Sequence, residues 1–295
     1  MQKIVPGLWF DKNCEEAMNF YVSVFPDSKI VDTVYYPENA EDKHLQGMDG
    51  KVLNGFFELF GQSFFALDGG PIFRFNPSKS FLVNCESREE VDGYWEKLSD
   101  GGKVLMELGE YPFSPWYGWV EDKYGLSWQL ILTNPEGDPR PKITPSIMFI
   151  HENAGKAEEA RDFYLSVFKD FQKGNTFPYE PGTAPDDASK IAYLDFQLLG
   201  VWFAAMDSGR DMHQFDLNEA VSFIVNCDDQ AEIDYYWEKL SAVPESEQCG
   251  WLKDKYGVSW QIIPKNMGEL VMNKPAAMNA MMKMKKIDIE KLQNV

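Results

Sequence analysis

The chain is poor in the residues that most often bind metals, form disulfides or contact nucleic acids. Its 295 residues include only three histidines, and four cysteines without paired spacing, at positions 14, 85, 227 and 249. We therefore expect free thiols in a reducing cytosol. Basic residues are also scarce, because 28 lysines and arginines face 47 acidic residues, a formal net charge of −19. This charge argues against nucleic acid and anionic membrane surfaces as partners.

Long apolar segments and phosphate-binding turns are missing as well. No apolar run reaches the length that crosses a bilayer, and the opening residues MQKIVPGLWF lack the features of a signal peptide. These absences predict a cytoplasmic protein with no membrane partner. Gly69-Gly70 and Gly101-Gly102 are isolated pairs, and neither joins a strand to a helix in a G-x-G pattern. A typical adenosylmethionine-dependent methyltransferase needs such a turn, so that activity is not expected.

What the chain does contain is a repeat of long period. The segment GWVEDKYGLSWQLIL at 118–132 returns as GWLKDKYGVSWQII at 250–263. The string SFLVNC at 80–85 returns at 222–227 as SFIVNC, an offset of 142 positions, whereas Gln129 and Gln261 are only 132 apart. The second copy has therefore lost about ten residues. A self-match at this period predicts a duplicated domain.

Each copy is predicted to contain the order strand, helix, strand, strand, strand twice. Helix caps are predicted at Asn13 with Glu16, Ser87 with Glu90, and Asp229 with Glu232. Predicted loops are residues 37–50, 174–189 and the aromatic segment YPFSPWY at 111–117, which has no counterpart in the second copy. In the Asp-Lys-Tyr-Gly turns, the aspartate side chain closes the turn and glycine supplies the positive φ. Strand alternation then places Gln129 on the face opposite Trp128.

The predicted fold class is α+β, with two tandem domains. Each is expected to be a pair of βαβββ units that form one cupped mixed sheet with its helices outside. The N-terminal domain is placed at residues 1–134, a linker at 135–142 and the C-terminal domain at 143–265. A helical tail follows at 266–295, with one helix at 275–285 that docks on the body or across a dimer.

Four strings carry a resemblance to a known family: PGLWFDKNCEEAMNFY, GGPIFRFNPSKSFLVNC, YWEKLS and GWVEDKYGLSWQ. They are similar to the PhnB-like branch of the vicinal-oxygen-chelate superfamily, which contains glyoxalases, bleomycin-resistance proteins and dihydroxybiphenyl dioxygenases. That branch is often labelled 3-demethylubiquinone-9 3-methyltransferase. The resemblance covers about residues 1–265 and implies tandem glyoxalase-like domains.

The resemblance also implies a site in the cup of each domain. Enzymes of the superfamily hold a divalent metal there, usually with His, His and Glu as ligands. The matching positions here are Pro6, Ser80 and Gln129 in the first copy and Pro145, Ser222 and Gln261 in the second. Proline has no donor atom in its side chain, serine is a poor ligand for a transition metal, and glutamine carries no charge. The histidines, His44, His151 and His213, lie elsewhere, so we expect neither a metal nor a cofactor.

The polar residues mapped to the cups are the candidate ligand-binding residues. They are Glu58, Ser80, Asn84, Gln129, Gln197, Ser222 and Gln261. Glu58 and Gln197 match the position of a further carboxylate of the superfamily. The same side chains have a second interpretation, in which they satisfy one another or buried water. No catalytic residue is assigned.

Three functions stay open from the sequence. The favoured one is a metal-free protein that binds a small organic molecule in one or both cups, as bleomycin-resistance relatives do. The first alternative is a metal-dependent lyase, isomerase or dioxygenase that uses Glu58 with Gln129. The second alternative is a non-catalytic interaction protein whose cups are vestigial. The halves are expected to pack as an intrachain pseudo-dimer, with a homodimer possible, and any function is expected mainly in the N-terminal cup.

Overall fold

The computed structural model describes residues 2–36, 48, 50–272 and 274–295. Within them the chain forms four consecutive units, and all but the fourth have three strands after the helix. The first unit is β1 (Ile4–Phe10), α1 (Cys14–Val24), β2 (Lys29–Tyr35), β3 (Val52–Leu59) and β4 (Gln62–Asp68). The second unit is β5 (Lys79–Cys85), α2 (Arg88–Ser99), β6 (Lys103–Tyr111), β7 (Ser114–Glu121) and β8 (Ser127–Leu132).

The second half repeats this order in shortened form. The third unit is β9 (Ile143–Phe149), η2 (His151–Asn153), α3 (Ala157–Val167), β10 (Phe171–Pro178), β11 (Ile191–Leu198) and β12 (Val201–Asp207). The fourth unit is β13 (Val221–Cys227), α4 (Gln230–Leu240), η3 (Pro244–Ser246), β14 (Trp251–Lys253) and β15 (Ser259–Pro264). The tail adds α5 (Met267–Val271), α6 (Pro275–Met281) and α7 (Ile289–Gln293).

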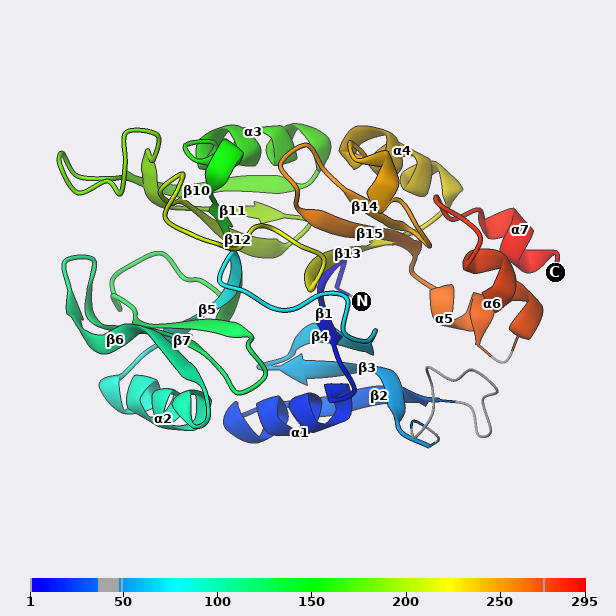
Figure 1. The fold of residues 1–295 in the computed structure, drawn as a ribbon, viewed down its shortest axis with the longest axis horizontal. Coiled ribbons are helices and arrows are strands. Elements are labelled where there is room, and N and C mark those ends of the chain that lie inside the picture. The colour runs from blue at the N-terminus through cyan, green and yellow to red at the C-terminus, as the bar shows by residue number, and fades with distance from the viewer. Residues whose placement is uncertain (1, 37–47, 49, 273) are drawn as a thin grey trace.

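The described strands form two mixed sheets, and each sheet draws on both halves of the chain (Figure 1). Sheet A has seven strands in the order β14-β15-β13-β1-β4-β3-β2, and sheet B has eight in the order β10-β11-β12-β9-β5-β8-β7-β6. The α+β class with mixed sheets is confirmed. The expectation that each half closes its own sheet is wrong, because β1 pairs antiparallel with β13 and β5 pairs antiparallel with β9.

The hydrophobic cores, in contrast, follow the two halves. In the first half, Phe64 of sheet A meets Phe81 of sheet B edge to face, with ring centroids 5.3 Å apart. Tyr21 of α1 stacks on Phe57 and also lies against Trp128. The second half has an equivalent core. Each half is therefore held together by apolar burial between its two units, and the halves are joined by strand pairing.

The segments that cross from one sheet to the other contact each other with approximate two-fold symmetry. Asn76 Nδ2 donates to the carbonyl of Asp216 over 2.9 Å, and Asn218 Nδ2 donates to the carbonyl of Arg74 over 2.8 Å. The two pairs are related by the same 142-residue offset as the sequence repeat. The buried ammonium group of Lys79 also donates hydrogen bonds to two carbonyls at the start of β13. Burial lowers the pKa of Lys79 to about 7.

Most predicted local features are present, with three corrections. The caps at Ser87 and Asp229 form, but Asn13 occupies its N-cap position without a side-chain cap bond. The aromatic segment 111–117 is a hairpin between β6 and β7 rather than a loop, and β10 covers part of the loop predicted at 174–189. The loop predicted at 37–50 falls mostly outside the described residues.

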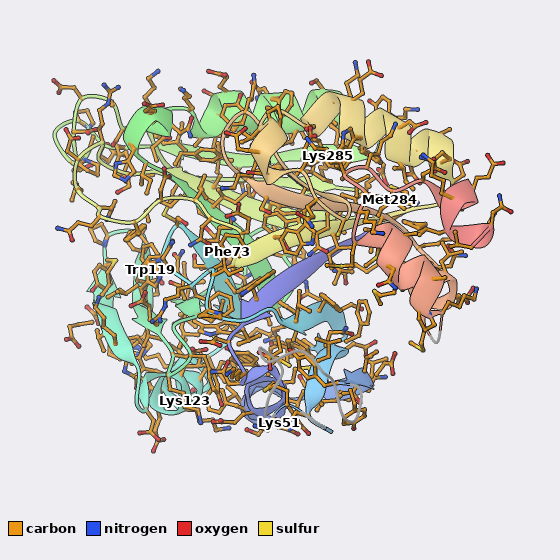
Figure 2. The ribbon with its side chains drawn as sticks, turned by 45° about the vertical axis from the view of Figure 1, so that its right-hand side comes forward. Lys51, Phe73, Trp119, Lys123, Met284 and Lys285 are labelled. Carbon is orange, nitrogen blue, oxygen red and sulfur yellow. The ribbon has the colours of Figure 1, made fainter. Side chains whose placement is uncertain are left out.

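The tail packs on the C-terminal half and contains more helix than the sequence pattern indicates. The predicted helix at 275–285 is shorter, and α5 and α7 flank it. Ala277, Ile287 and Leu292 are buried in the second core. The amides of Cys249 and Gly250 donate to the carbonyls of Met284 and Lys285, both over 2.8 Å. Met284 and Lys285 are labelled in Figure 2. Within the described part of the chain, no helix combines the length and apolar character needed to span a bilayer.

Candidate functional site

Each sheet has one face covered by helices (Figure 1), and the other face is called its cup. The same pair of polar side chains lies in both cups. In sheet B, Gln129 Nε2 donates to Ser80 Oγ over 2.8 Å, and in sheet A, Gln261 Nε2 donates to Ser222 Oγ over 2.9 Å. All four side chains are buried. These hydrogen bonds are the ones that the second interpretation describes, in which the polar side chains of a cup satisfy one another.

The first strand contributes a different residue from the one predicted. A Cβ built on Gly7 would lie 2.9 Å from Ser222 Oγ and 3.0 Å from Gln261 Nε2, so Gly7 faces the sheet-A cup. Pro6 faces the helices because side chains alternate along a strand. In sheet B the corresponding residue is Ser146, which lies directly opposite Ser80, and not Pro145. The resemblance therefore placed the cup residue of β1 and that of β9 one position too early in the chain.

The predicted N-terminal cup does not exist as one site, because its residues are divided between the sheets. Glu58 lies on β3 in sheet A, where it forms an ion pair with Lys29 at 3.2 Å. Gln129 lies in sheet B. The prediction of a single site that uses Glu58 together with Gln129 is therefore wrong. Gln197 lies in sheet B opposite Trp202 and is partly buried.

Asn84 and its counterpart Asn226 bond to the chain segments that lead into β9 and β1, the strands at which the two halves pair. Asn84 Nδ2 donates to the carbonyl of Pro141 over 2.7 Å, and Asn226 Nδ2 donates to the carbonyl of Gln2 over 3.0 Å. Buried backbone carbonyls need such partners. This geometry favours the structural interpretation for Asn84.

The floor of the sheet-B cup is a chain of neutral hydrogen bonds. The Tyr117 hydroxyl donates to Gln129 Oε1 over 2.7 Å, and the amide of Gln129 then donates to Ser80. Ser80 lies opposite both Ser127 and Ser146, so three hydroxyls form a row beside Gln129. Tyr117 and Gln129 are each 4% exposed, and burial raises the pKa of Tyr117. These groups recognise hydrogen-bonding atoms and carry no charge.

An aromatic group covers one side of this floor. Tyr111 and Phe113, at the tip of the β6–β7 hairpin, are stacked with ring centroids 5.5 Å apart. Phe113 meets Tyr117 edge to face at 5.0 Å and is 62% exposed. An exposed aromatic ring above buried polar groups is typical of the mouth of a ligand site. The second half lacks this hairpin tip, since β14 has only three residues.

The opposite side of the sheet-B cup holds an ion pair that the sequence pattern did not indicate. Arg140, from the linker, donates through Nε to Asp195 Oδ2 over 2.8 Å and through Nη2 to Oδ1 over 3.2 Å. Its guanidinium lies 3.8 Å from the centre of the Trp202 ring. Asp195 is 2% exposed, and its charge is neutralised within the cup. No local motif marks this pair, because its members meet only through the fold.

The sheet-A cup is filled by its own side chains. Trp9 packs edge to face against Trp251 at 6.0 Å and against Phe73 at 5.0 Å. The space left beside Phe65 and Gln261 has no room for a water molecule. The two cups are thus unequal.

The hydroxyl of Ser259 shows a further difference between the cups. It is buried and has no hydrogen-bond partner, whereas the Trp119 indole donates to the equivalent Ser127 Oγ over 2.7 Å.

The donor set of neither cup fits the metal centre implied by the superfamily. Hydroxyl and amide groups face each cup at the mapped positions, and they bond to one another. Among the described residues, no three His, Cys, Asp or Glu side chains converge as metal ligands. Of the histidines, His151 contacts the carbonyls of Arg210 and Phe215, His213 contacts Ser208, and His44 lies outside the described residues.

The comparison with protein families identifies the family. A family model described as 3-demethylubiquinone-9 3-methyltransferase matches residues 2–131 and, a second time, residues 141–263. The chain belongs to this family. The double match confirms the predicted duplication and the PhnB-like resemblance.

Several solved structures are similar to this family member. A Bacillus cereus PhnB protein with the same description is 46% identical, covers 45% of this chain and 100% of its own, and has a TM-score of 0.42. Glyoxalase I from Zea mays is 11% identical, covers 89% of this chain and 94% of its own, and has a TM-score of 0.54. The latter likeness confirms the glyoxalase fold. No curated protein matches the chain.

Proposed function

We propose that this family member binds a small, neutral organic molecule in the sheet-B cup and does so without a metal ion. The observation that carries the proposal is the Tyr117–Gln129–Ser80 hydrogen-bond chain, which lies beside the exposed Tyr111–Phe113 stack. Glutamine and serine side chains both donate and accept hydrogen bonds, so they recognise a carbonyl, amide or hydroxyl group. The aromatic stack supplies an apolar wall for a planar ligand.

The charge balance of the cup supports a neutral ligand. Arg140 and Asp195 satisfy each other through two hydrogen bonds, so neither offers a free charge to a bound molecule. The sheet-A cup contributes structure in this proposal, because Trp9 and Trp251 occupy it. The four unpaired cysteines are compatible with the proposed reducing cytosol.

The fold differs from the one that typical methyltransferases use, although the family description names a methyltransferase. Typical adenosylmethionine enzymes use a parallel sheet whose first strand leads through a glycine-rich turn into a helix. Here both sheets are mixed, and the turn from β1 to α1 reads Asp11-Lys12-Asn13. Binding in a cup requires neither feature.

A ligand screen with matched variants tests the proposal. Protein purified without added ligand is examined by native mass spectrometry and then by a thermal-shift screen of neutral aromatic amides, lactams and quinones. We expect a ligand whose binding is lost in Gln129→Ala and retained in Gln261→Ala, with both variants folded by circular dichroism. Equal losses in the two variants contradict the assignment of the sheet-B cup.

Metal analysis tests the second part of the proposal. The chain is expressed with added nickel, zinc, manganese or iron(II), and the purified protein is measured by plasma mass spectrometry. We expect substoichiometric metal that is unchanged by Gln129→Ala and Gln261→Ala. One equivalent of metal that disappears in either variant overturns the metal-free site and favours the metal-dependent alternative.

A further inference from the structure

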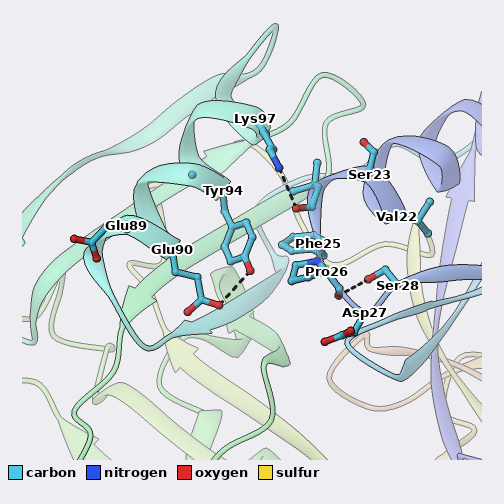
Figure 3. A pocket seen from close by; sticks show the side chains of 12 residues that line it. Val22, Ser23, Phe25, Pro26, Asp27, Ser28, Glu89, Glu90, Tyr94 and Lys97 are labelled. Atoms are coloured by element: carbon cyan, nitrogen blue, oxygen red, sulfur yellow. Dashed lines mark hydrogen bonds between the residues drawn. The ribbon is translucent and has the colours of Figure 1, made fainter.

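A groove of about 510 Å³ lies on the helical side of the first half, away from both cups (Figure 3). One wall is the end of α1 and the residues after it, 22–28, and the other is α2, with Glu89, Glu90, Gly93, Tyr94 and Lys97. A Cβ built on Gly93 meets no atom within 4 Å. The groove therefore opens onto the backbone of α2 at Gly93, and we call it the Gly93 groove. Its volume falls in the range of small-molecule sites.

The second half shows what this space accommodates. Tyr235 stands on α4 at the position equivalent to Gly93, since Tyr236 repeats Tyr94 with the same 142-residue offset. The Tyr235 hydroxyl donates to the carbonyl of Val167 over 2.7 Å, and its ring meets Tyr236 edge to face at 5.3 Å. Lys169 Nζ lies 5.0 Å from the centre of the Tyr235 ring. A phenol side chain thus occupies in the second half the place that is open in the first.

The first half keeps two of the three partners of that phenol, the carbonyl and the neighbouring tyrosine, whereas Pro26 stands in the place of Lys169. Val24 is the counterpart of Val167, and its carbonyl belongs to the last turn of α1, where carbonyls have no partner within the helix. The contact that this carbonyl receives from Lys97 Nζ is long, at 3.5 Å. Tyr94, the counterpart of Tyr236, lies beside Phe25 (Figure 3). Their ring centres are 5.1 Å apart.

We propose that the Gly93 groove binds a small free phenol. The ring takes the place that Tyr235 fills in the second half and lies edge-on to Tyr94, while its hydroxyl donates to the Val24 carbonyl. Lys97 is close enough to face the ring as a cation. Glu89, Glu90 and Asp27 at the rim make the groove acidic, so the neutral phenol is favoured over a phenolate or a carboxylate. This site is independent of the proposed ligand in the sheet-B cup.

Nuclear magnetic resonance of the labelled full chain tests the site with para-cresol as the probe. We expect para-cresol to shift the amide of Gly93 and to saturate at one site. Toluene, which lacks the hydroxyl, is the matched control, and the loss of one hydrogen bond should weaken binding about tenfold. In Gly93→Tyr the new side chain fills the groove, so the shifts around α2 should disappear. In Tyr235→Gly an equivalent groove opens, and a second site should appear around α4.

Several results overturn the proposal. A Gly93 amide that stays unshifted up to the solubility limit of para-cresol rejects the site, and so does undiminished binding in Gly93→Tyr. Equal affinity for toluene rejects the role of the Val24 carbonyl. Binding of a tyrosine-containing peptide in place of para-cresol assigns the groove to a polypeptide partner and also contradicts the proposal. Gln129→Ala serves as the separating control, because it should abolish binding in the sheet-B cup and leave the para-cresol shifts unchanged.

Discussion

The hydroxyl of Tyr21 donates to Oδ2 of Asp122 over 2.9 Å, although the two residues are 101 positions apart in the chain. The Trp128 indole donates to the same oxygen, and the amides of Tyr124 and Leu126 donate to Oδ1. The second half repeats this arrangement with Tyr164, Asp254, Trp260, Tyr256 and Val258. Each carboxylate thus ties the last turn of one unit to the helix of the preceding unit.

Asp122→Asn should destabilise the fold strongly. All four groups around the Asp122 carboxylate are donors, so the asparagine NH₂ would face donors instead of supplying an acceptor. We expect the free energy of unfolding to fall by about 2 to 4 kcal/mol. Chemical denaturation measures this loss. Asp187→Asn, on an exposed loop, is the control and should stay within about 0.5 kcal/mol of the parent; equal effects contradict the role of the network.

The same carboxyl group predicts a pH dependence of stability. Burial is the largest cause that raises the pKa of Asp122 from 3.8 to about 6. Because the folded pKa lies above the unfolded one, the contribution to stability is fully present below the unfolded pKa and is lost as the pH rises through the folded pKa. From about pH 7 to about pH 5, the difference in unfolding free energy between parent and Asp122→Asn should grow by roughly 1 kcal/mol. Denaturation at both pH values checks this, and a constant difference contradicts it.

Arg140→Ala should be costly because it leaves the buried Asp195 without its cation. We expect a loss of about 3 to 5 kcal/mol, and Arg140→Lys should recover part of it while losing the two-point contact. The matched control is Arg88→Ala. Arg88 also lies over a tryptophan, Trp116 at 4.1 Å, but its ion pair with Glu110 is exposed. That control should cost less than about 1 kcal/mol, so similar losses for both arginines in urea denaturation contradict the prediction.

Two glycines of the β6–β7 hairpin should respond differently to alanine. A Cβ on Gly118 would lie 2.5 Å from the ring of Trp95, whereas a Cβ on Gly109 meets no atom within 4 Å. Gly118→Ala should therefore cost about 1 to 3 kcal/mol through displacement of the Trp95 ring, and Gly109→Ala should cost less than about 0.5 kcal/mol. Thermal unfolding compares them, and the reverse order would contradict the close packing of α2 on β7.

Features that depend on neighbouring residues were predictable. The cap at Ser87, the turn closed by Asp122 and the alternation that turns Gln129 away from Trp128 all arise within a few positions of the chain. Gln129 and Ser80 lie on neighbouring strands of the same unit, and their hydrogen bond matches the second interpretation, in which the polar side chains satisfy one another. The cup residue of β1 was nevertheless predicted one position too early. Only the register of β1 against β13 shows that Gly7 lies opposite Ser222.

The amino-acid sequence by itself determined the duplication, the family, the order of elements and the uncharged serine and glutamine residues of both cups. Only the tertiary structure decided which units share a sheet, and hence that Glu58 and Gln129 lie in different cups, that Arg140 reaches Asp195 and that Gly93 opens a groove. The reason is physical. Hydrogen bonds in turns and caps are set by residues close in the chain, but the two copies carry nearly the same strand edges. Which edges meet depends on the packing of the whole molecule.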